Sequence, residues 1–223
     1  MHLDPATILF EMIAFLFAIC VHESAHAWVA GLCGDPTATM LGRVTLNPLK
    51  HVDLFGSLII PLIGLAAGGY MIGWAKPTPV DPRHFRHPMR DDIVTSLAGP
   101  ASNLLIAAAS CVALIILSFT SPIGRLLVHG YRLETNSVLV PIVFFFQVML
   151  DINVLLAVFN VIPVPPLDGS HVLRHFLPES ARRTYDTMGM YGLLIILLIG
   201  WRFIPAMMNP IVFFFNGVVY KLS

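Results

Sequence analysis

Residues 18–31 of the chain read AICVHESAHAWVAG and lie inside a longer apolar run that covers about 7–31. An apolar run near 20 residues is long enough to cross a bilayer as a helix, so this stretch predicts a membrane-spanning helix. It also carries ionisable side chains, in the motif His22-Glu23-Ser24-Ala25-His26. Because each unpaired ionisable group deep in a bilayer costs about 2.5–3.5 kcal/mol, we expect these side chains to have a partner.

The composition of the whole chain agrees with a membrane location. Of its 223 residues, 57% are hydrophobic and only 12% are charged, and the mean hydropathy is +0.79. The formal net charge is +0, which gives no reason to expect a nucleic-acid partner. The three cysteines have no CxxC spacing, so we interpret them as small buried apolar residues rather than as metal ligands.

Further apolar segments follow along the chain. The stronger ones cover 93–119, 137–162 and 187–204, and a weaker one covers 206–221. Residues 54–75 contain Pro61 and five glycines, which interrupt helical hydrogen bonding, so this segment is expected to be re-entrant rather than spanning. The sequence thus predicts one domain, residues 1–223, with the fold of an all-α polytopic membrane protein of about five transmembrane helices.

The HExxH motif on the 7–31 helix indicates a metal site. Two histidines four residues apart lie on one helical face, about 5–6 Å apart, and can share one zinc ion. Glu23 then stands beside the open position of the metal, where it can take a proton from a zinc-bound water and pass it to a leaving amine. The alternative is that His22 and His26 only form hydrogen bonds between helices.

A catalytic zinc needs a third protein ligand. The candidates are Asp53, Asp151, Asp168 and His171. Asp168 lies in FNVIPVPPLDGSHV, where prolines end a helix and Gly169 permits a tight turn that can hold a carboxylate rigidly. Asp151 precedes it by about 25 Å of regular helix, so both cannot lie at the depth of the metal. We therefore favour Asp168, whose alternative role is that of a turn aspartate.

Several motifs together resemble the site-2 protease family of intramembrane zinc metalloproteases. They are HESAH (22–26), GRVTLNPLKHVDLFGS (42–57), GWAKPTPVDPRHFR (73–86), LAGPASNLL (97–105) and NVIPVPPLDGSHVL (160–173). The chain is most similar to the compact bacterial and archaeal branch, which lacks PDZ and CBS domains. The resemblance implies one zinc per chain, held by His22, His26 and Asp168, with Glu23 as general base.

The same resemblance implies further structural and functional features. A small membrane-embedded β-hairpin is expected in the region 37–53, its edge pairing with a substrate that unwinds inside the bilayer. Asn103 and Asn160 match the family pattern and are expected to bind substrate or the oxyanion, or else to join helices by hydrogen bonds. His171 is expected near the metal or in a solvated loop. Gly99 and Pro100 are expected to permit close helix packing.

The function that this resemblance implies is hydrolysis of peptide bonds in the transmembrane segments of other proteins, either in regulated intramembrane proteolysis or in clearance of signal-peptide remnants. Arginine-rich loops at 75–92 and 170–185 are expected on the cytoplasmic side of the cell membrane, together with the active site. One alternative is an ion-coupled transporter. Inverted repeats in the sequence would favour it, and we find none. The other is a non-catalytic metal-binding scaffold, which would have no use for Glu23 as a base.

Overall fold

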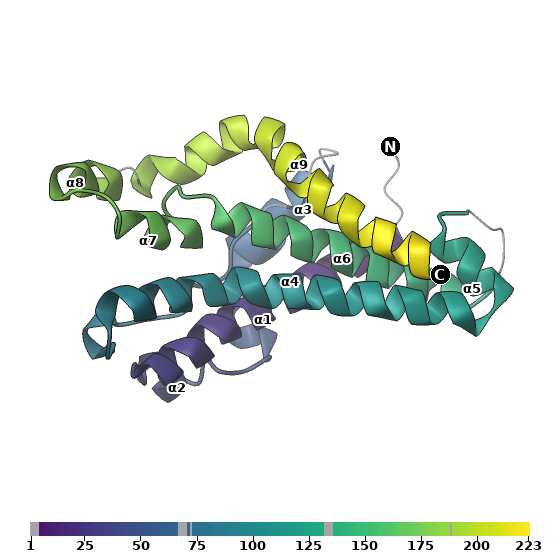
Figure 1. Ribbon diagram of the computed structural model, residues 1–223, viewed down its shortest axis with the longest axis horizontal. Helices are drawn as coiled ribbons and strands as arrows, with labels where there is room; N and C mark the ends of the chain where they lie inside the picture. The colour runs from purple at the N-terminus through teal and green to yellow at the C-terminus, as the bar shows by residue number, and fades with distance from the viewer. Residues whose placement is uncertain (1–4, 67–70, 72, 132–135, 188) are drawn as a thin grey trace.

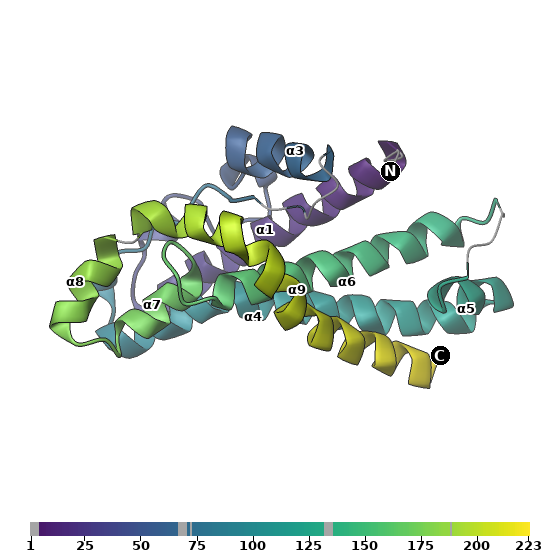
Figure 2. The same cartoon turned by 90° about the horizontal axis from the view of Figure 1, so that it is seen from above.

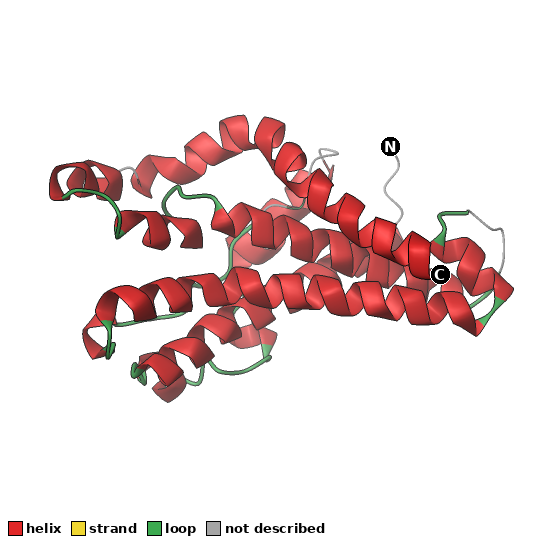
Figure 3. Ribbon diagram, in the orientation of Figure 1, coloured by secondary structure: helices red, strands yellow, loops and turns green. Residues whose placement is uncertain are grey.

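A computed structural model describes residues 5–66, 71, 73–131, 136–187 and 189–223 of the chain. Every regular element in these residues is a helix, as Figure 3 shows. The elements are α1 (Pro5–Cys33), α2 (Thr37–Met40), η1 (Pro48–Lys50), η2 (Leu54–Ile59), α3 (Ile60–Ala66), η3 (Pro82–His84), α4 (Pro88–Thr120), α5 (Pro122–Val128), α6 (Leu139–Val161), α7 (Asp168–Arg174), α8 (Glu179–Thr187) and α9 (Gly189–Leu222). The predicted all-α class is confirmed.

Helices α1, α4 and α6 form the centre of the molecule, and α4 packs against both of the others. Figures 1 and 2 show that α1 and α6 run in the same direction and that α4 runs in the opposite one. One apolar cluster joins α1 to α6 around Phe15 and Met149, and a second joins α4 to α6 and α9 around Leu114 and Val154. The parallel course of α1 and α6 brings the ends of both helices to the same level of the molecule.

Prolines mark where several of these helices begin and end. Pro5, Pro88 and Pro122 are the first residues of α1, α4 and α5, where a missing N–H costs nothing because it would have no partner inside the helix. Helix α6 ends at Val161, directly before the proline-rich turn 163–166. The short helix α7 begins after that turn, so the turn determines where Asp168 is placed.

Four helices among the described residues are long and apolar enough to cross a membrane, rather than the expected five or so. They are Pro5–Cys33, Pro88–Thr120, Leu139–Val161 and the part of α9 from Phe203 to Leu222. The expected separate passes 187–204 and 206–221 belong to one continuous helix, α9, which contains Pro205 and Pro210. Proline removes one helical hydrogen bond and bends the helix without ending it, and Figure 1 shows α9 bent in its middle.

Residues 54–66 of the weak segment 54–75 are helical but short. A π-helix of six residues, η2, continues into the seven-residue α3. Together they extend about 20 Å, which is less than the roughly 30 Å of a bilayer core. This part cannot cross a membrane as a helix, while residues 67–70 and 72 lie outside the described part of the chain.

The prediction of a β-hairpin in 37–53 was wrong. This region contains α2, a turn, bends and η1, and no strand. Side chains take the carbonyl groups that a hairpin ladder would use: the Thr45 carbonyl accepts hydrogen bonds from Ser24 and His51, and the Lys50 carbonyl accepts one from Arg43. One of these contacts, that of Ser24, comes from α1 outside the region, and the motif GRVTLNP could not reveal it.

Candidate active site

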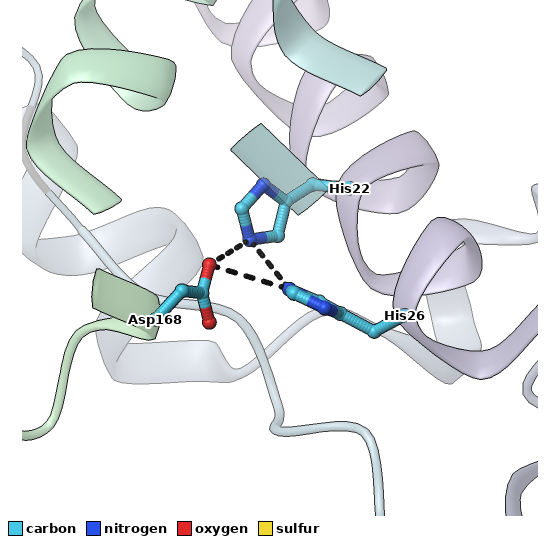
Figure 4. Close-up of side chains that lie close together, drawn as sticks. All are labelled: His22, His26 and Asp168. Atoms are coloured by element: carbon cyan, nitrogen blue, oxygen red, sulfur yellow. Dashed lines mark hydrogen bonds and ion pairs between the residues drawn. The ribbon is translucent and has the colours of Figure 1, made fainter. Parts of the chain in front are cut away.

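Three of the predicted site residues meet where the C-terminal half of α1 faces the start of α7. His22 and His26 come from successive turns of α1, and Asp168 is the first residue of α7 (Figure 4). The two Nε2 atoms lie 3.1 Å apart. Oδ2 of Asp168 lies 3.1 Å from Nε2 of His22 and 3.3 Å from Nε2 of His26. Both histidines are buried. The three ligand atoms therefore form a nearly equilateral triangle.

The return of the chain from α6 into α7 requires a glycine beside Asp168. A Cβ atom on Gly169 would collide with the carbonyl group of Val161, the last residue of α6. Leu167 is buried against Leu155 and Phe159 of α6 and anchors the turn from the other side. The carboxylate of Asp168 is therefore held on a backbone that folds tightly back onto α6.

The Nδ1 atoms of both histidines have hydrogen-bond partners on α4. Nδ1 of His26 lies 2.7 Å from the carbonyl oxygen of Thr95, and since a carbonyl can only accept, this Nδ1 carries the proton. Nδ1 of His22 lies 2.6 Å from Oδ1 of Asn103 and donates to it in the same way. Each neutral imidazole then has a bare lone pair on Nε2, and both lone pairs lie near Asp168.

This donor set fits a zinc ion. Two imidazole lone pairs and a carboxylate oxygen converge without a proton to share, and Oδ2 of Asp168 is buried with no hydrogen-bond donor. Three acceptors at such short range repel one another unless a cation lies between them. In a tetrahedral site with bonds near 2.0–2.1 Å, ligand atoms are about 3.3 Å apart, close to the edges of the observed triangle. Among the described residues, these three form the group whose ligand atoms lie close enough together to hold one metal ion.

Glu23 follows His22 on α1 and is held by a segment distant in sequence. The backbone N–H of Thr78 donates to Oε2 of Glu23 over 2.9 Å, and the Thr78 hydroxyl donates to the Glu23 carbonyl over 3.0 Å. Residues 73–81 around Thr78 run without helix or turn. The carboxylate beside the metal-ligand triangle therefore has a fixed orientation.

A cavity of about 510 Å³ opens onto these groups. Its lining includes His22, Glu23, His26, Asp168, Asn160 and His171. Its size falls within the roughly 300–1,000 Å³ of typical ligand-binding pockets. The segment from Gly73 to Val80, which has no regular secondary structure, forms much of the remaining wall. The cavity therefore combines a metal-ligand set, a carboxylate and a non-helical backbone segment.

The sequence of the chain matches the model of peptidase family M50 over residues 10–200. The chain belongs to this family.

Curated relatives of this M50 chain carry metalloprotease names. The Bacillus subtilis protein named "Putative zinc metalloprotease YwhC" is 34% identical over 84% of this chain and 78% of its own length. Two proteins named "Putative zinc metalloprotease Rip2" match as well. The one from Mycolicibacterium smegmatis is 31% identical over 83% of this chain and 64% of its own length. The one from Mycobacterium tuberculosis H37Rv is 29% identical over 93% of this chain and 70% of its own length. No solved structure matches the chain. The expected family and its zinc cofactor are confirmed.

The other candidate carboxylates lie apart from the metal-ligand triangle of this M50 protease. Asp53 caps η2 by accepting hydrogen bonds from the backbone N–H groups of Phe55 and Gly56. Asp151 is exposed on α6. Neither belongs to the metal-binding group, so of the four candidates only Asp168 reaches the histidines in the described structure.

The remaining three predicted site residues occupy different surroundings. Asn160 lines the cavity, and its Nδ2 donates to the Leu156 carbonyl one turn earlier on α6. His171 also lines the cavity, with Nδ1 3.6 Å from Oδ1 of Asp92, and this carboxylate raises the pKa of His171. Asn103 is fully buried behind His22 and does not line the cavity.

Sequence reasoning missed several residues of the M50 site. Thr95 contributes only a backbone carbonyl and Thr78 mainly a backbone N–H, for which a sequence carries no signal. Gly99 was expected to permit close helix packing, and it does so at the metal site itself: a Cβ atom there would lie 2.5 Å from Nε2 of His22. Asn153 is a polar residue within the apolar run 137–162, and this departure from the pattern would have identified it as a candidate.

Proposed function

We propose that this M50 metalloprotease is an intramembrane endopeptidase that hydrolyses peptide bonds within transmembrane segments of other proteins. The observation that carries the proposal is the convergence of His22, His26 and Asp168, with Glu23 alongside, on one cavity between helices apolar enough to cross a membrane. In this proposal the substrate approaches from within the bilayer and presents extended backbone at the site, because helical backbone has its amide and carbonyl groups already paired.

In this proposal His22, His26 and Asp168 hold the zinc ion. When bound, zinc supplies a Lewis acid that lowers the pKa of a water molecule toward 7 and polarises the scissile carbonyl. Glu23 accepts the proton of the attacking water and delivers it to the leaving amine. The hydrogen bond from Thr78 holds the Glu23 carboxylate in position for both transfers.

Two further residues on the cavity wall are proposed to act on the substrate. Asn160 presents an amide group that can bind the substrate backbone or the developing oxyanion. His171 lies one turn after Asp168 on α7, and Asp92 favours its charged form, which suits a group that stabilises negative charge. Both contacts would be made at the reacting centre rather than along the rest of the substrate.

We also propose that the site lies in the cytoplasmic half of the cell membrane. The arginine-rich segments 75–92 and 170–185 lie at the same end of the molecule, the end where α1 and α6 terminate (Figures 1 and 2). The positive-inside rule favours the cytoplasm for such segments. Helical residues 54–66, which are too few to cross the bilayer, then do not span it.

The test is the substitution Glu23→Gln, which keeps the shape of the side chain and removes its base. Cleavage of a helical membrane substrate by the purified protein should fall by about 10²–10⁴-fold, the usual contribution of a general base. Bound zinc, measured by metal analysis, should stay at one per chain. The matched control is Glu11→Gln on the same helix, which should leave both quantities unchanged.

Two results would contradict the proposal. One is cleavage by the Glu23→Gln variant at the wild-type rate, which would remove Glu23 from the mechanism. The other is a wild-type protein that binds zinc but cleaves soluble extended peptides and leaves transmembrane substrates intact, which would place the substrate outside the bilayer.

A further inference from the structure

A chain of buried hydrogen bonds leads from His22 into the interior of the helix bundle. Nδ1 of His22 lies 2.6 Å from Oδ1 of Asn103 on α4. Nδ2 of Asn103 donates to Oδ1 of Asn153 on α6 over 2.9 Å, and Nδ2 of Asn153 donates to the Met149 carbonyl over 2.8 Å. Both asparagines have no exposed surface. Three helices are therefore linked through two amide side chains.

The direction of every bond in this chain is fixed from its far end. The Met149 carbonyl can only accept, so Asn153 must present its NH₂ group there and its oxygen to Asn103. Asn103 must then donate its NH₂ group to Asn153 and present its oxygen to His22. That oxygen can only accept, which places the proton of His22 on Nδ1 and leaves Nε2 bare.

From this geometry we infer that Asn153 is a positioning residue for the metal site: acting through Asn103, it fixes the tautomer and ring orientation of His22. Asn153 itself lies outside the cavity and one helix away from the metal-ligand triangle. The inference rests on the proposed zinc site and adds a residue that no motif in the HExxH or LDG segments includes.

A purely structural role for Asn153, joining α4 to α6, makes a different prediction. In that case, replacing Asn153 would lower the stability of the fold but leave the zinc affinity of the folded protein unchanged. If Asn153 positions His22, its replacement lets the Asn103 amide rotate, so that an NH₂ group can face Nδ1 and the ring loses its required proton position. Zinc affinity then separates the two roles.

The experiment measures the zinc dissociation constant of the purified full chain by competition with a chelator. Asn103→Leu should weaken zinc binding by about 10–100-fold, the usual effect of removing the partner of a metal-bound histidine. Asn153→Leu should weaken it by about tenfold. In the Asn103→Leu background, Asn153→Leu should have no further effect, because its route to His22 is already broken.

Two further variants control for packing and for polarity. Val154, next to Asn153 on α6, is also fully buried, and Val154→Ala shortens its side chain. This variant should lower the melting temperature without changing zinc affinity. Asn153→Asp, protonated in this apolar interior, can still donate to Met149 and accept from Asn103, so it should bind zinc within about threefold of wild type.

Several outcomes would overturn the inference. Unchanged zinc affinity in Asn153→Leu, with a stability loss like that of Val154→Ala, would leave a structural role only. If Asn153→Leu weakened zinc binding equally in the wild-type and Asn103→Leu backgrounds, Asn153 would not act through Asn103. Failure of the proposed zinc site is a separate result: His22→Ala would then bind zinc as tightly as wild type.

Discussion

Thr78 holds Glu23 from both ends: its backbone N–H donates to the carboxylate and its hydroxyl donates to the backbone carbonyl of the same residue. The two residues are 55 positions apart in sequence. The segment that carries Thr78 is in turn bound to the rest of the fold by backbone hydrogen bonds from Trp74 to Gly56 and from Lys76 to His51. The orientation of the proposed general base thus depends on a non-helical segment far in sequence from the HExxH motif.

Substitution of Thr78 should lower catalysis without removing zinc. Thr78→Pro eliminates the N–H that holds the carboxylate, and we expect cleavage to fall by roughly tenfold to a hundredfold, as for other misplacements near 1 Å. Thr78→Val keeps the N–H and loses only the hydroxyl, so its effect should be much smaller. Rates on a transmembrane substrate and metal analysis of the same samples check both expectations. A Thr78→Pro variant that cleaves faster than wild type would show instead that this contact inhibits the enzyme.

Substitution of Gly99 should disturb the metal site directly. A methyl group at this position would meet His22 and His26 at the nitrogens that face Asp168, and the hydrogen bonds on Nδ1 leave both rings little freedom to move aside. Gly99→Ala should therefore weaken zinc binding by about a hundredfold or more, measured by chelator competition.

Gly124→Ala is the matched control for this steric effect. Its Cβ would collide with the Leu117 carbonyl, so it also strains the fold, but it lies on α5, apart from the metal-ligand residues. Its zinc affinity should equal that of wild type. If both glycine variants weakened zinc binding equally, the effect would reflect general destabilisation, and the close approach at Gly99 would have no special meaning.

Asp35 predicts a pH dependence of stability. Its fully buried carboxylate accepts hydrogen bonds from Thr37 and from the backbone N–H of Asp81 over 2.7 Å, joining the end of α1 to the segment before α4. Burial alone would raise its pKa, but these bonds and that of His84 hold the pKa of Asp35 below its usual value. Because the folded pKa is the lower one, this stabilisation is present above about pH 4 and is lost as the pH falls through the folded pKa.

Asp35→Asn tests this by thermal unfolding in detergent. It should cost about 2 kcal/mol at neutral pH, since it replaces charge-assisted hydrogen bonds and turns an NH₂ group toward a donor. The difference from wild type should shrink below about pH 4. Asp186→Asn, which removes the exposed pair with Arg174, serves as the control and should change stability little at any pH. A difference between Asp35→Asn and wild type that stayed constant down to low pH would contradict the assignment.

The amino-acid sequence determined the features that depend on local spacing. The i, i+4 separation of His22 and His26 places both imidazoles on one face of α1 whatever the rest of the chain does. The apolar runs predicted membrane-spanning helices, and the proline-rich turn before Asp168 predicted where α6 ends. These properties follow from helix geometry and from the missing N–H of proline.

Only the tertiary structure decided which distant groups complete the site. The acceptors for Nδ1 of His22 and His26 lie on α4, and the backbone N–H that holds Glu23 belongs to Thr78. Asn153 is linked to His22 only through a second amide, that of Asn103. The β-hairpin expected at 37–53 failed for a related reason, because side chains, including Ser24 of α1, occupy its carbonyl groups. Such contacts depend on how whole helices pack. The backbone groups of Thr95 and Thr78 are the same in almost every residue type, so no local pattern in the sequence shows which partners they meet.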